Sequence, residues 1–152
     1  MPRAPSDRFV QDARRAKRET AGIRFAYTIL YVPDVARSIA FYESAFGLIA
    51  RFVAESGEYG ELDSGPTTLG FAQEDFAAGG RGGLRARPLR PDDEPPSCEV
   101  AFACDDVAAA YDRALAAGAT AITEPTQKPW GQTVAYVRDR DGVIVELCTP
   151  VS

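Results

Sequence analysis

The sequence predicts an α+β fold in which two βαβββ modules form a cupped, eight-stranded mixed sheet around a cleft, with the helices outside. The first observation is an internal repeat, because residues 27–35 align with residues 99–107 at a constant offset of 72 positions. An internal repeat is stronger evidence for a fold than the propensities of single segments. The second is that a four-stranded sheet with one helix buries only one face well, so two modules are expected to pair.

Module 1 begins with a strand over residues 25–32, which are rich in aromatic and β-branched side chains. Apolar residues at helical spacing then predict a helix from Asp34 to Phe46, with Gly47 as its C-terminal stop. The remaining strands of the module are predicted over residues 48–54, 59–62 and 67–72.

Module 2 repeats this order. A strand over residues 98–104 leads into a helix that starts at residues 105–106 and stops at Gly118. The Asp-Gly pair at residues 141–142 supplies the tight turn of a final hairpin, because glycine takes the positive φ that such turns need. Strands are predicted over residues 120–122, 133–137 and 143–148, with a loop over residues 124–131.

The chain therefore divides into an arm and one domain. Residues 1–22 form a basic N-terminal arm, either a flexible tail or a helix that packs on the domain or a partner subunit. Residues 23–150 form the domain, with module 1 at 23–73, a linker at 74–97 and module 2 at 98–150. The glycine cluster of the linker lacks the strand-to-helix context of a phosphate-binding loop, so a flexible connection is expected.

Composition and charge exclude several classes of protein. Of 152 residues, 45% are hydrophobic and 26% are charged, as in soluble globular domains. No apolar run approaches the ~20 residues of a membrane helix, the N-terminus lacks a signal-peptide core, and the three cysteines are expected to be reduced. We therefore expect a cytoplasmic protein without a membrane partner.

The charge is uneven and histidine is absent. Residues 1–24 carry seven basic and three acidic side chains, whereas the remainder carries ten and nineteen, within a net charge of −5. An acidic body argues against nucleic acid as the main partner. Because the sequence has no histidine, imidazole bases, Ser-His-Asp triads and histidine-ligated metals are excluded.

The paired modules resemble the vicinal oxygen chelate superfamily, which includes glyoxalase I, bleomycin-resistance proteins, fosfomycin-resistance transferases and extradiol dioxygenases. The resemblance covers about residues 23–150 and implies the fold more firmly than any one activity. The motifs that carry it are Val32-Pro-Asp34…Ser38…Phe41-Tyr42…Gly47-Leu48 in module 1 and Asp139-Arg-Asp-Gly142…Glu146-Leu147 in module 2.

The resemblance also implies where a metal would be held. Family ligands come from the first and last strand of each module, as two histidines and two glutamates in glyoxalase I. The matching positions here are Tyr27, Gly70, Glu99 and Glu146. Only Glu146 keeps the expected residue type and Glu99 is another carboxylate, so a tight Ni²⁺ or Zn²⁺ site is not expected.

Glu99 and Glu146 are expected to point into one cleft, where their repulsion would raise the pKa of one of them. Four interpretations stay open. The pair could share Mg²⁺, Mn²⁺ or Ca²⁺ with Tyr27 and waters, act as a metal-free acid–base pair, or bind a cationic or hydroxylated ligand. Alternatively, one glutamate is solvated and the other meets Arg24 or Arg138.

Tyr27, Tyr31, Gly70 and Trp130 complete the predicted ligand pocket. Tyr27 and Tyr31 alternate on the first strand, and Tyr27 either lines the pocket opposite Glu99 or packs in the core. Trp130 lies in a Pro-Trp-Gly stretch. It resembles a stretch that many members of the superfamily have at the mouth of the pocket. Its ring either stacks on a ligand or caps the end of the sheet.

The sequence therefore predicts a glyoxalase/bleomycin-resistance-like protein that binds a small organic molecule without the standard His/Glu metal site. The alternative is a divalent-metal-dependent lyase or isomerase similar to lactoylglutathione lyase, with Glu99 and Glu146 as catalytic and metal-binding residues. Whether the chain is an enzyme stays open, and the only cofactor considered is one divalent metal ion. A homodimer is expected, because family members commonly pair modules and one face would otherwise stay exposed.

Overall fold

The computed structural model describes residues 22–151, so the expected arm lies outside the described residues except for Gly22. Both modules follow the predicted βαβββ order, and β1 and β5, like α2 and α4, start 72 positions apart. The elements are β1 (Tyr27–Val32), α2 (Val35–Phe46), β2 (Ile49–Val53), β3 (Tyr59–Asp63), β4 (Thr68–Gln73), α3 (Glu74–Gly80), β5 (Glu99–Ala103), α4 (Val107–Ala116), β6 (Thr120–Gln127), β7 (Thr133–Arg138) and β8 (Ile144–Cys148).

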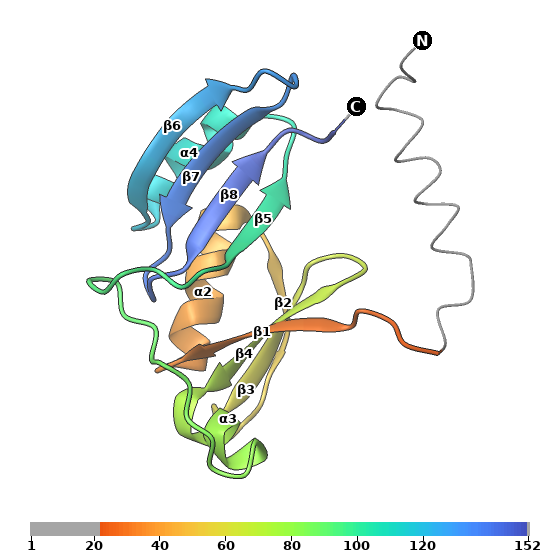
Figure 1. Cartoon of the computed structure of the whole chain (residues 1–152), viewed down its shortest axis with the longest axis vertical. Coiled ribbons are helices and arrows are strands. Elements are labelled where there is room, and N and C mark those ends of the chain that lie inside the picture. The colour runs from red at the N-terminus through yellow and green to blue at the C-terminus, as the bar shows by residue number, and fades with distance from the viewer. Residues whose placement is uncertain (1–21, 152) are drawn as a thin grey trace.

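The eight strands form two mixed sheets of four. Sheet A has the order β1-β4-β3-β2 and sheet B the order β5-β8-β7-β6. In each sheet the first strand of the module pairs in parallel with the last, and the other neighbours are antiparallel. The predicted α+β fold of two βαβββ modules is confirmed, and Figure 1 shows β5 as the edge of sheet B on the side of sheet A.

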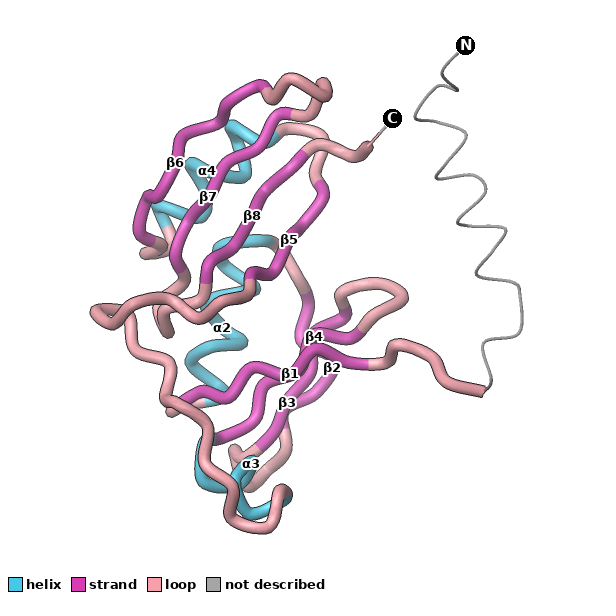
Figure 2. Tube along the Cα trace, in the orientation of Figure 1, coloured by secondary structure: helices cyan, strands magenta, loops and turns pink. Residues whose placement is uncertain are grey.

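The helices cover one face of each sheet. Helix α2 packs on sheet A, α4 packs on sheet B, and the two helices pack on each other (Figure 2). Buried side chains such as Tyr42, Phe71 and Leu147 join both modules in one hydrophobic core. The face of each sheet that points away from the helices is called its outer face below. Within residues 22–151, no helix is long and apolar enough to cross a bilayer.

Local sequence sets the ends of the two longer helices. The Asp34 carboxylate accepts a hydrogen bond from the Arg37 N–H at 3.0 Å, and Asp106 accepts one from the Ala109 N–H at 2.9 Å. These amides have no acceptor inside their helices, so the caps supply one. Gly47 ends α2 in the left-handed conformation, with φ of 70°, as the sequence predicted.

Strand β6 is longer than the sequence predicted. It continues to Gln127, through part of the loop expected over residues 124–131. Pro125 is tolerated because β6 is an edge strand that pairs with β7 alone, so its missing N–H is not needed on the open side. Shifts of register along the β6–β7 pair accommodate the irregular stretch.

The linker is fastened to module 2, which differs from the expected flexible connection. The Arg138 guanidinium donates hydrogen bonds to the carbonyls of Gly142, Arg90 and Asp93. A Cβ on Gly142 would lie 2.5 Å from the Arg90 carbonyl oxygen. The linker backbone therefore approaches the final hairpin so closely that only glycine fits there.

Candidate functional site

Glu146 lies on the outer face of sheet B, beside a tyrosine. Val145 and Leu147 are buried in the core, so Glu146 projects from the opposite face of β8. Its cross-strand partner is Tyr136, whose hydroxyl donates to Glu146 Oε2 at 2.9 Å. This hydrogen bond, followed by burial, raises the pKa of Tyr136 to about 12. At neutral pH, Tyr136 therefore remains a protonated donor.

Glu99 reaches the same face from β5. The register pairs Ala101 with Glu146 and Glu99 with Ile144, which makes the two glutamates diagonal neighbours. Desolvation, followed by hydrogen bonding to and repulsion from Glu146, raises the pKa of Glu99. The neighbouring Glu146 carboxylate therefore makes Glu99 harder to ionise.

The structure thus brings the predicted carboxyl pair together. Within residues 22–151, neither glutamate forms an ion pair with Arg24 or Arg138. Arg138 is engaged with carbonyl oxygens of the linker and the hairpin. The pair therefore presents carboxyl oxygens that no basic side chain of the described region neutralises.

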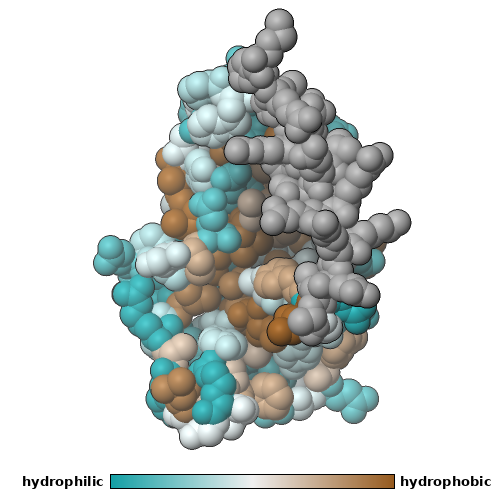
Figure 3. Space-filling view, turned by 45° about the vertical axis from the view of Figure 1, so that its right-hand side comes forward, coloured by the Kyte–Doolittle hydropathy of each residue, from teal (hydrophilic) through white to brown (hydrophobic). Residues whose placement is uncertain are grey.

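An open groove leads from Glu99 along the seam between the modules. Its volume is about 250 Å³, and it is lined by β5 from Glu99 to Phe102 on one side and by Thr28, Ser64 and residues 67–69 on the other. This size is close to the lower end of the range for small-molecule sites. Figure 3 shows apolar surface near the middle of the molecule, flanked by polar surface at both ends.

In module 1, the position that the resemblance matches to a ligand is Gly70, and a tyrosine hydroxyl occupies the space above it. A Cβ on Gly70 would lie 3.0 Å from Tyr59 Oη. That hydroxyl donates to Glu61 Oε1 at 2.9 Å, and Arg51 Nη1 lies 3.3 Å from Glu61 Oε2. Burial, followed by the hydrogen bond to Glu61, raises the pKa of Tyr59 to about 12.

Four polar residues of the outer faces were not among the predicted site residues, namely Tyr136, Tyr59, Glu61 and Arg51. A signal was available for three of them. Counting across the hairpin turn places Tyr136 opposite the predicted Glu146. Alternation along the strand at residues 59–63 puts Tyr59 and Glu61 on one face. Arg51 had no such signal, because β2 shifts register next to it.

Within residues 22–151, Tyr27, Tyr31 and Trp130 form no hydrogen bond with the carboxyl pair. Tyr27, with 53% of its surface exposed, lies on the outer face of sheet A. The Tyr31 ring lies at the far end of β1, 4.3 Å from the Arg81 guanidinium. Trp130 is 67% exposed in the turn between β6 and β7, where its indole N–H donates to Gln132 Oε1 at 2.8 Å.

The donor set does not fit the metal site that the family resemblance implies. Within residues 22–151, no three His, Cys, Asp or Glu side chains are grouped so that they could hold a metal ion. Gly70 offers no donor atom, and the space above it contains the Tyr59 hydroxyl. Glu146 already accepts a hydrogen bond from Tyr136. The groups available for chemistry on the outer faces are therefore carboxyl and phenol groups.

Comparison with known proteins links this arrangement to one family. Residues 24–147 match the family model for the Glyoxalase/Bleomycin resistance protein/Dioxygenase superfamily. The chain is also similar to a curated protein, the probable lactoylglutathione lyase of Vibrio cholerae serotype O1 (strain ATCC 39315 / El Tor Inaba N16961). The two are 28% identical over 137 residues, which cover 82% of this chain and 88% of the relative.

Solved structures share the fold. A glyoxalase-related enzyme from Fulvimarina pelagi aligns with a TM-score of 0.71 and 25% identity, over 84% of this chain and 88% of that chain. A glyoxalase/bleomycin resistance protein/dioxygenase family enzyme from Burkholderia phytofirmans PsJN aligns with a TM-score of 0.69 and 21% identity, over 86% of this chain and 100% of that chain.

Proposed function

Because the chain belongs to the Glyoxalase/Bleomycin resistance protein/Dioxygenase superfamily, we propose that it binds a small organic molecule at the outer face of sheet B, without a His/Glu metal site. One observation carries the proposal. Glu99 lines the end of the seam groove, Glu146 is its neighbour on β8, and the Tyr136 hydroxyl donates a hydrogen bond to the Glu146 carboxylate.

The chemistry of this cluster selects the class of ligand. Two adjacent carboxyl groups accept hydrogen bonds and favour a ligand with a cationic or hydroxylated group, because charge-assisted hydrogen bonds are the stronger kind. Side-chain hydroxyls of Thr28 and Thr67 line the groove next to Glu99 and add donors and acceptors. Val100 and Phe102 alternate with Glu99 along β5 and pack against the core, so they would contact only the part of such a ligand that lies in the groove.

The alternative is a lyase or isomerase of the lactoylglutathione lyase kind. The curated relative carries that name at 28% identity, and Glu146 stands where the family resemblance places a glutamate. In this alternative Glu99 and Glu146 would act as the catalytic carboxyl groups. The raised pKa of Glu99, caused by desolvation and by Glu146, supports acid–base work, whereas the donor set gives little support to a metal.

Calorimetry on the metal-stripped protein separates the two functions. Mg²⁺, Mn²⁺, Co²⁺, Ni²⁺ and Zn²⁺ would be titrated into wild type, Glu99→Gln and Glu146→Gln, with Glu124→Gln on β6 as the charge-matched control. We expect no saturable metal binding. Stoichiometric binding that Glu146→Gln abolishes, together with turnover of the glutathione hemithioacetal, would establish the alternative.

Ligand binding is tested on the same variants with a panel of small organic amines and polyols, by calorimetry and thermal shift. We expect a saturable ligand whose affinity falls at least about tenfold in Glu146→Gln, while Glu124→Gln binds like wild type. If no member of the panel binds saturably, or if all three variants weaken binding equally, the proposed site on sheet B is wrong.

We also propose a homodimer that covers the outer face of sheet A. Large apolar side chains are exposed there and in the segment before β1, and contiguous patches of this kind mark interaction surfaces. They include Ile23, Phe25, Tyr27, Ile29 and Phe52. Light scattering should give about twice the 16.4 kDa chain mass. A monomer at micromolar concentrations would contradict the dimer but leave the site on sheet B intact.

A further inference from the structure

A second hollow lies on the other side of module 1, and the proposed function makes no use of it. It is formed by Tyr31 of β1, by α3 and by the linker segment that follows α3. It encloses only about 40 Å³, so it is a shallow, open site and a bound ligand would lie partly outside it. It shares no lining residue with the seam groove beside Glu99.

The chain concentrates positive charge at this hollow. Residues 81–90 contain four arginines and no acidic residue, although the whole chain has a net charge of −5. Three of the four line the hollow, namely Arg81, Arg85 and Arg87. Glu74 is the one carboxylate among the lining residues, and Arg90 binds its two oxygens at 2.6 and 3.2 Å. That carboxylate is therefore already matched.

Arg81 is held in position without any carboxylate partner in the described part of the chain. Its Nε and Nη2 atoms donate to the Leu84 carbonyl oxygen at 3.2 and 2.9 Å. Its guanidinium lies 4.3 Å from the centre of the Tyr31 ring, where the ring face attracts a cation. Because a guanidinium has five N–H donors and one carbonyl accepts here, donors remain for an anion.

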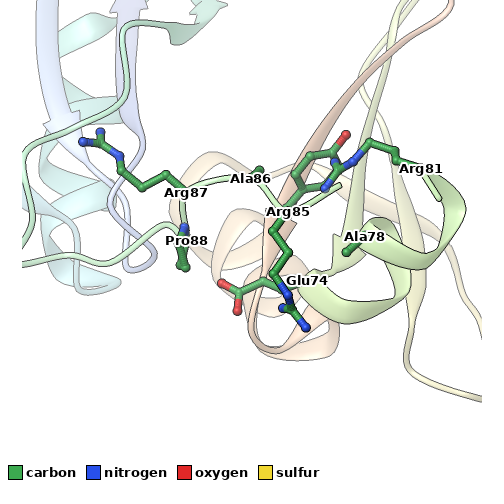
Figure 4. Close-up of a pocket in the computed structure, with 8 residues that line it drawn as sticks. Glu74, Ala78, Arg81, Arg85, Ala86, Arg87 and Pro88 are labelled. Atoms are coloured by element: carbon green, nitrogen blue, oxygen red, sulfur yellow. The ribbon is translucent and has the colours of Figure 1, made fainter. Parts of the chain in front are cut away.

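Arg85 adds a charge that a ligand can recruit. Its Nη1 lies 3.1 Å from Asp75 Oδ1, and both side chains are about three-quarters exposed. Exposed ion pairs of this kind are worth little, so Arg85 can exchange Asp75 for a better partner. In Figure 4, Arg85 extends beside Glu74 while Arg87 points away from the others. Arg81 and Arg85 are therefore the recognition residues.

We propose that this hollow binds a small molecule that carries a phosphate or carboxylate group on a flat, apolar body. The anion meets Arg81 and Arg85, because guanidinium groups match the geometry of both kinds of oxyanion. One edge of the body contacts the apolar lining supplied by Tyr31, Ala78 and Pro88, and the remainder extends out of the hollow. This site is independent of the carboxyl pair on sheet B, which favours the opposite charge.

The test is calorimetric titration of the full-length protein with phenyl phosphate, benzoate and inorganic phosphate. We expect saturable binding of at least one phenyl compound, several-fold tighter than that of inorganic phosphate. Phenyl phosphate and benzoate then distinguish the two sources of the anion. Binding should weaken as salt is raised, because the attraction is between exposed charges.

Variants locate the site. Arg81→Gln should weaken phenyl-anion binding at least about tenfold, since a charge-assisted pair is lost. Arg81→Lys keeps the charge but not the planar fork, and should weaken it less. Arg140→Gln removes the same charge from the hairpin turn outside the hollow and should leave affinity within about twofold. The urea midpoint of each variant shows that it remains folded.

Three results would overturn the proposal. They are the absence of saturable binding by any probe below about 10 mM, equal weakening by Arg81→Gln and Arg140→Gln, and equal affinity for inorganic phosphate and the phenyl compounds. The last would mean that only an adventitious ion binds and that Tyr31 is not part of a site. Failure here leaves the function proposed for Glu99 and Glu146 untouched, because those probes and variants are different.

Discussion

The hydroxyl of Tyr42 donates a hydrogen bond to Asp139 Oδ2 at 2.6 Å, across 97 positions of the chain. The other oxygen of Asp139 accepts the backbone N–H groups of Asp141, Gly142 and Val143. One carboxylate therefore shapes the β7–β8 turn and binds that turn to α2. Ser38 adds a second link, since its hydroxyl donates to Asp141.

Replacing Tyr42 by phenylalanine should destabilise the protein by about 1–3 kcal/mol, because the buried Asp139 carboxylate loses a donor. The matched control is Tyr111→Phe on α4. Tyr111 is also buried, but no hydrogen bond to its hydroxyl is seen within residues 22–151, so its loss should cost less than about 0.5 kcal/mol. Urea unfolding measures both, and equal losses would contradict the role given to Tyr42.

Two glycine substitutions should change stability in opposite directions. Gly70→Ala places a Cβ 3.0 Å from Tyr59 Oη and 3.4 Å from Ile29 Cγ1, so it should destabilise by about 1–3 kcal/mol. Gly79→Ala, in α3, meets no atom within 4 Å and should stabilise by about 0.4–1 kcal/mol. Unfolding curves decide the sign of each.

The phenol of Tyr59 supplies an internal check on the first of these substitutions. If the new methyl group acts by displacing that hydroxyl, Gly70→Ala should cost less in a Tyr59→Phe background, since the Tyr59–Glu61 hydrogen bond is already absent there. An unchanged cost would place the strain elsewhere, for example against Ile29. The four proteins form a double-mutant cycle.

The raised pKa of Glu99 predicts how its contribution to stability changes with pH. Because its pKa is higher in the folded protein than the ordinary value of 4.5, this contribution is complete below that value and is lost as pH rises through the folded pKa. Glu99→Gln does not titrate. Its stability relative to wild type should therefore be higher at pH 7 than at pH 4.

Urea unfolding at the two pH values measures this change, with Glu124→Gln as the control for net charge. If both variants show a similar pH dependence of stability, the change comes from the net negative charge of the domain and not from Glu99 itself. Carboxyl NMR titration gives a second reading. Removal of the second carboxylate in Glu146→Gln should lower the Glu99 pKa towards its ordinary value, while desolvation keeps it raised.

Arg138→Gln should release the linker from module 2, because the three carbonyl oxygens that it binds lose their shared donor. Hydrogen exchange of residues 89–94 should speed up at least several-fold, while exchange of α4 stays unchanged, as expected for local opening. Arg140→Gln, two positions along, is the charge-matched control. Uniform exchange rates across wild type and both variants would mean that Arg138 does not fasten the linker.

The fold could be predicted from the sequence because the residues that indicate each helix, strand and turn lie close together in the chain, and because the pattern occurs twice. Asp34 and Gly47 mark the ends of α2, and the repeat of 72 positions orders the second half by the first. The hairpin turn likewise fixes which residues face Glu146. These features depend on residues close in sequence, or on pairing that a tight turn dictates.

The candidate site was predicted only in part, since contacts across modules leave no local signal. Tyr42 stands among apolar residues at helical spacing and Asp139 stands beside a hairpin turn, and nothing near either in the sequence shows that they meet. Gly70 could be recognised as lacking a donor, but not as making room for a phenol from β3. Tyr31 follows the alternation of β1, yet the linker path that brings Arg81 over its ring follows no periodic pattern.

The contact between Tyr42 and Asp139 also bears on synthesis of the chain. A ribosome produces α2 long before it produces the β7–β8 turn, so Tyr42 lacks its acceptor until most of the polypeptide has emerged. Ser38 can meanwhile donate to the Asp34 carbonyl oxygen within its own helix. The buried phenol is therefore without a partner until the second module forms. The two modules therefore finish packing on each other late in synthesis. The N-terminal half on its own would lack Asp139, the hydrogen-bond acceptor of Tyr42 in α2.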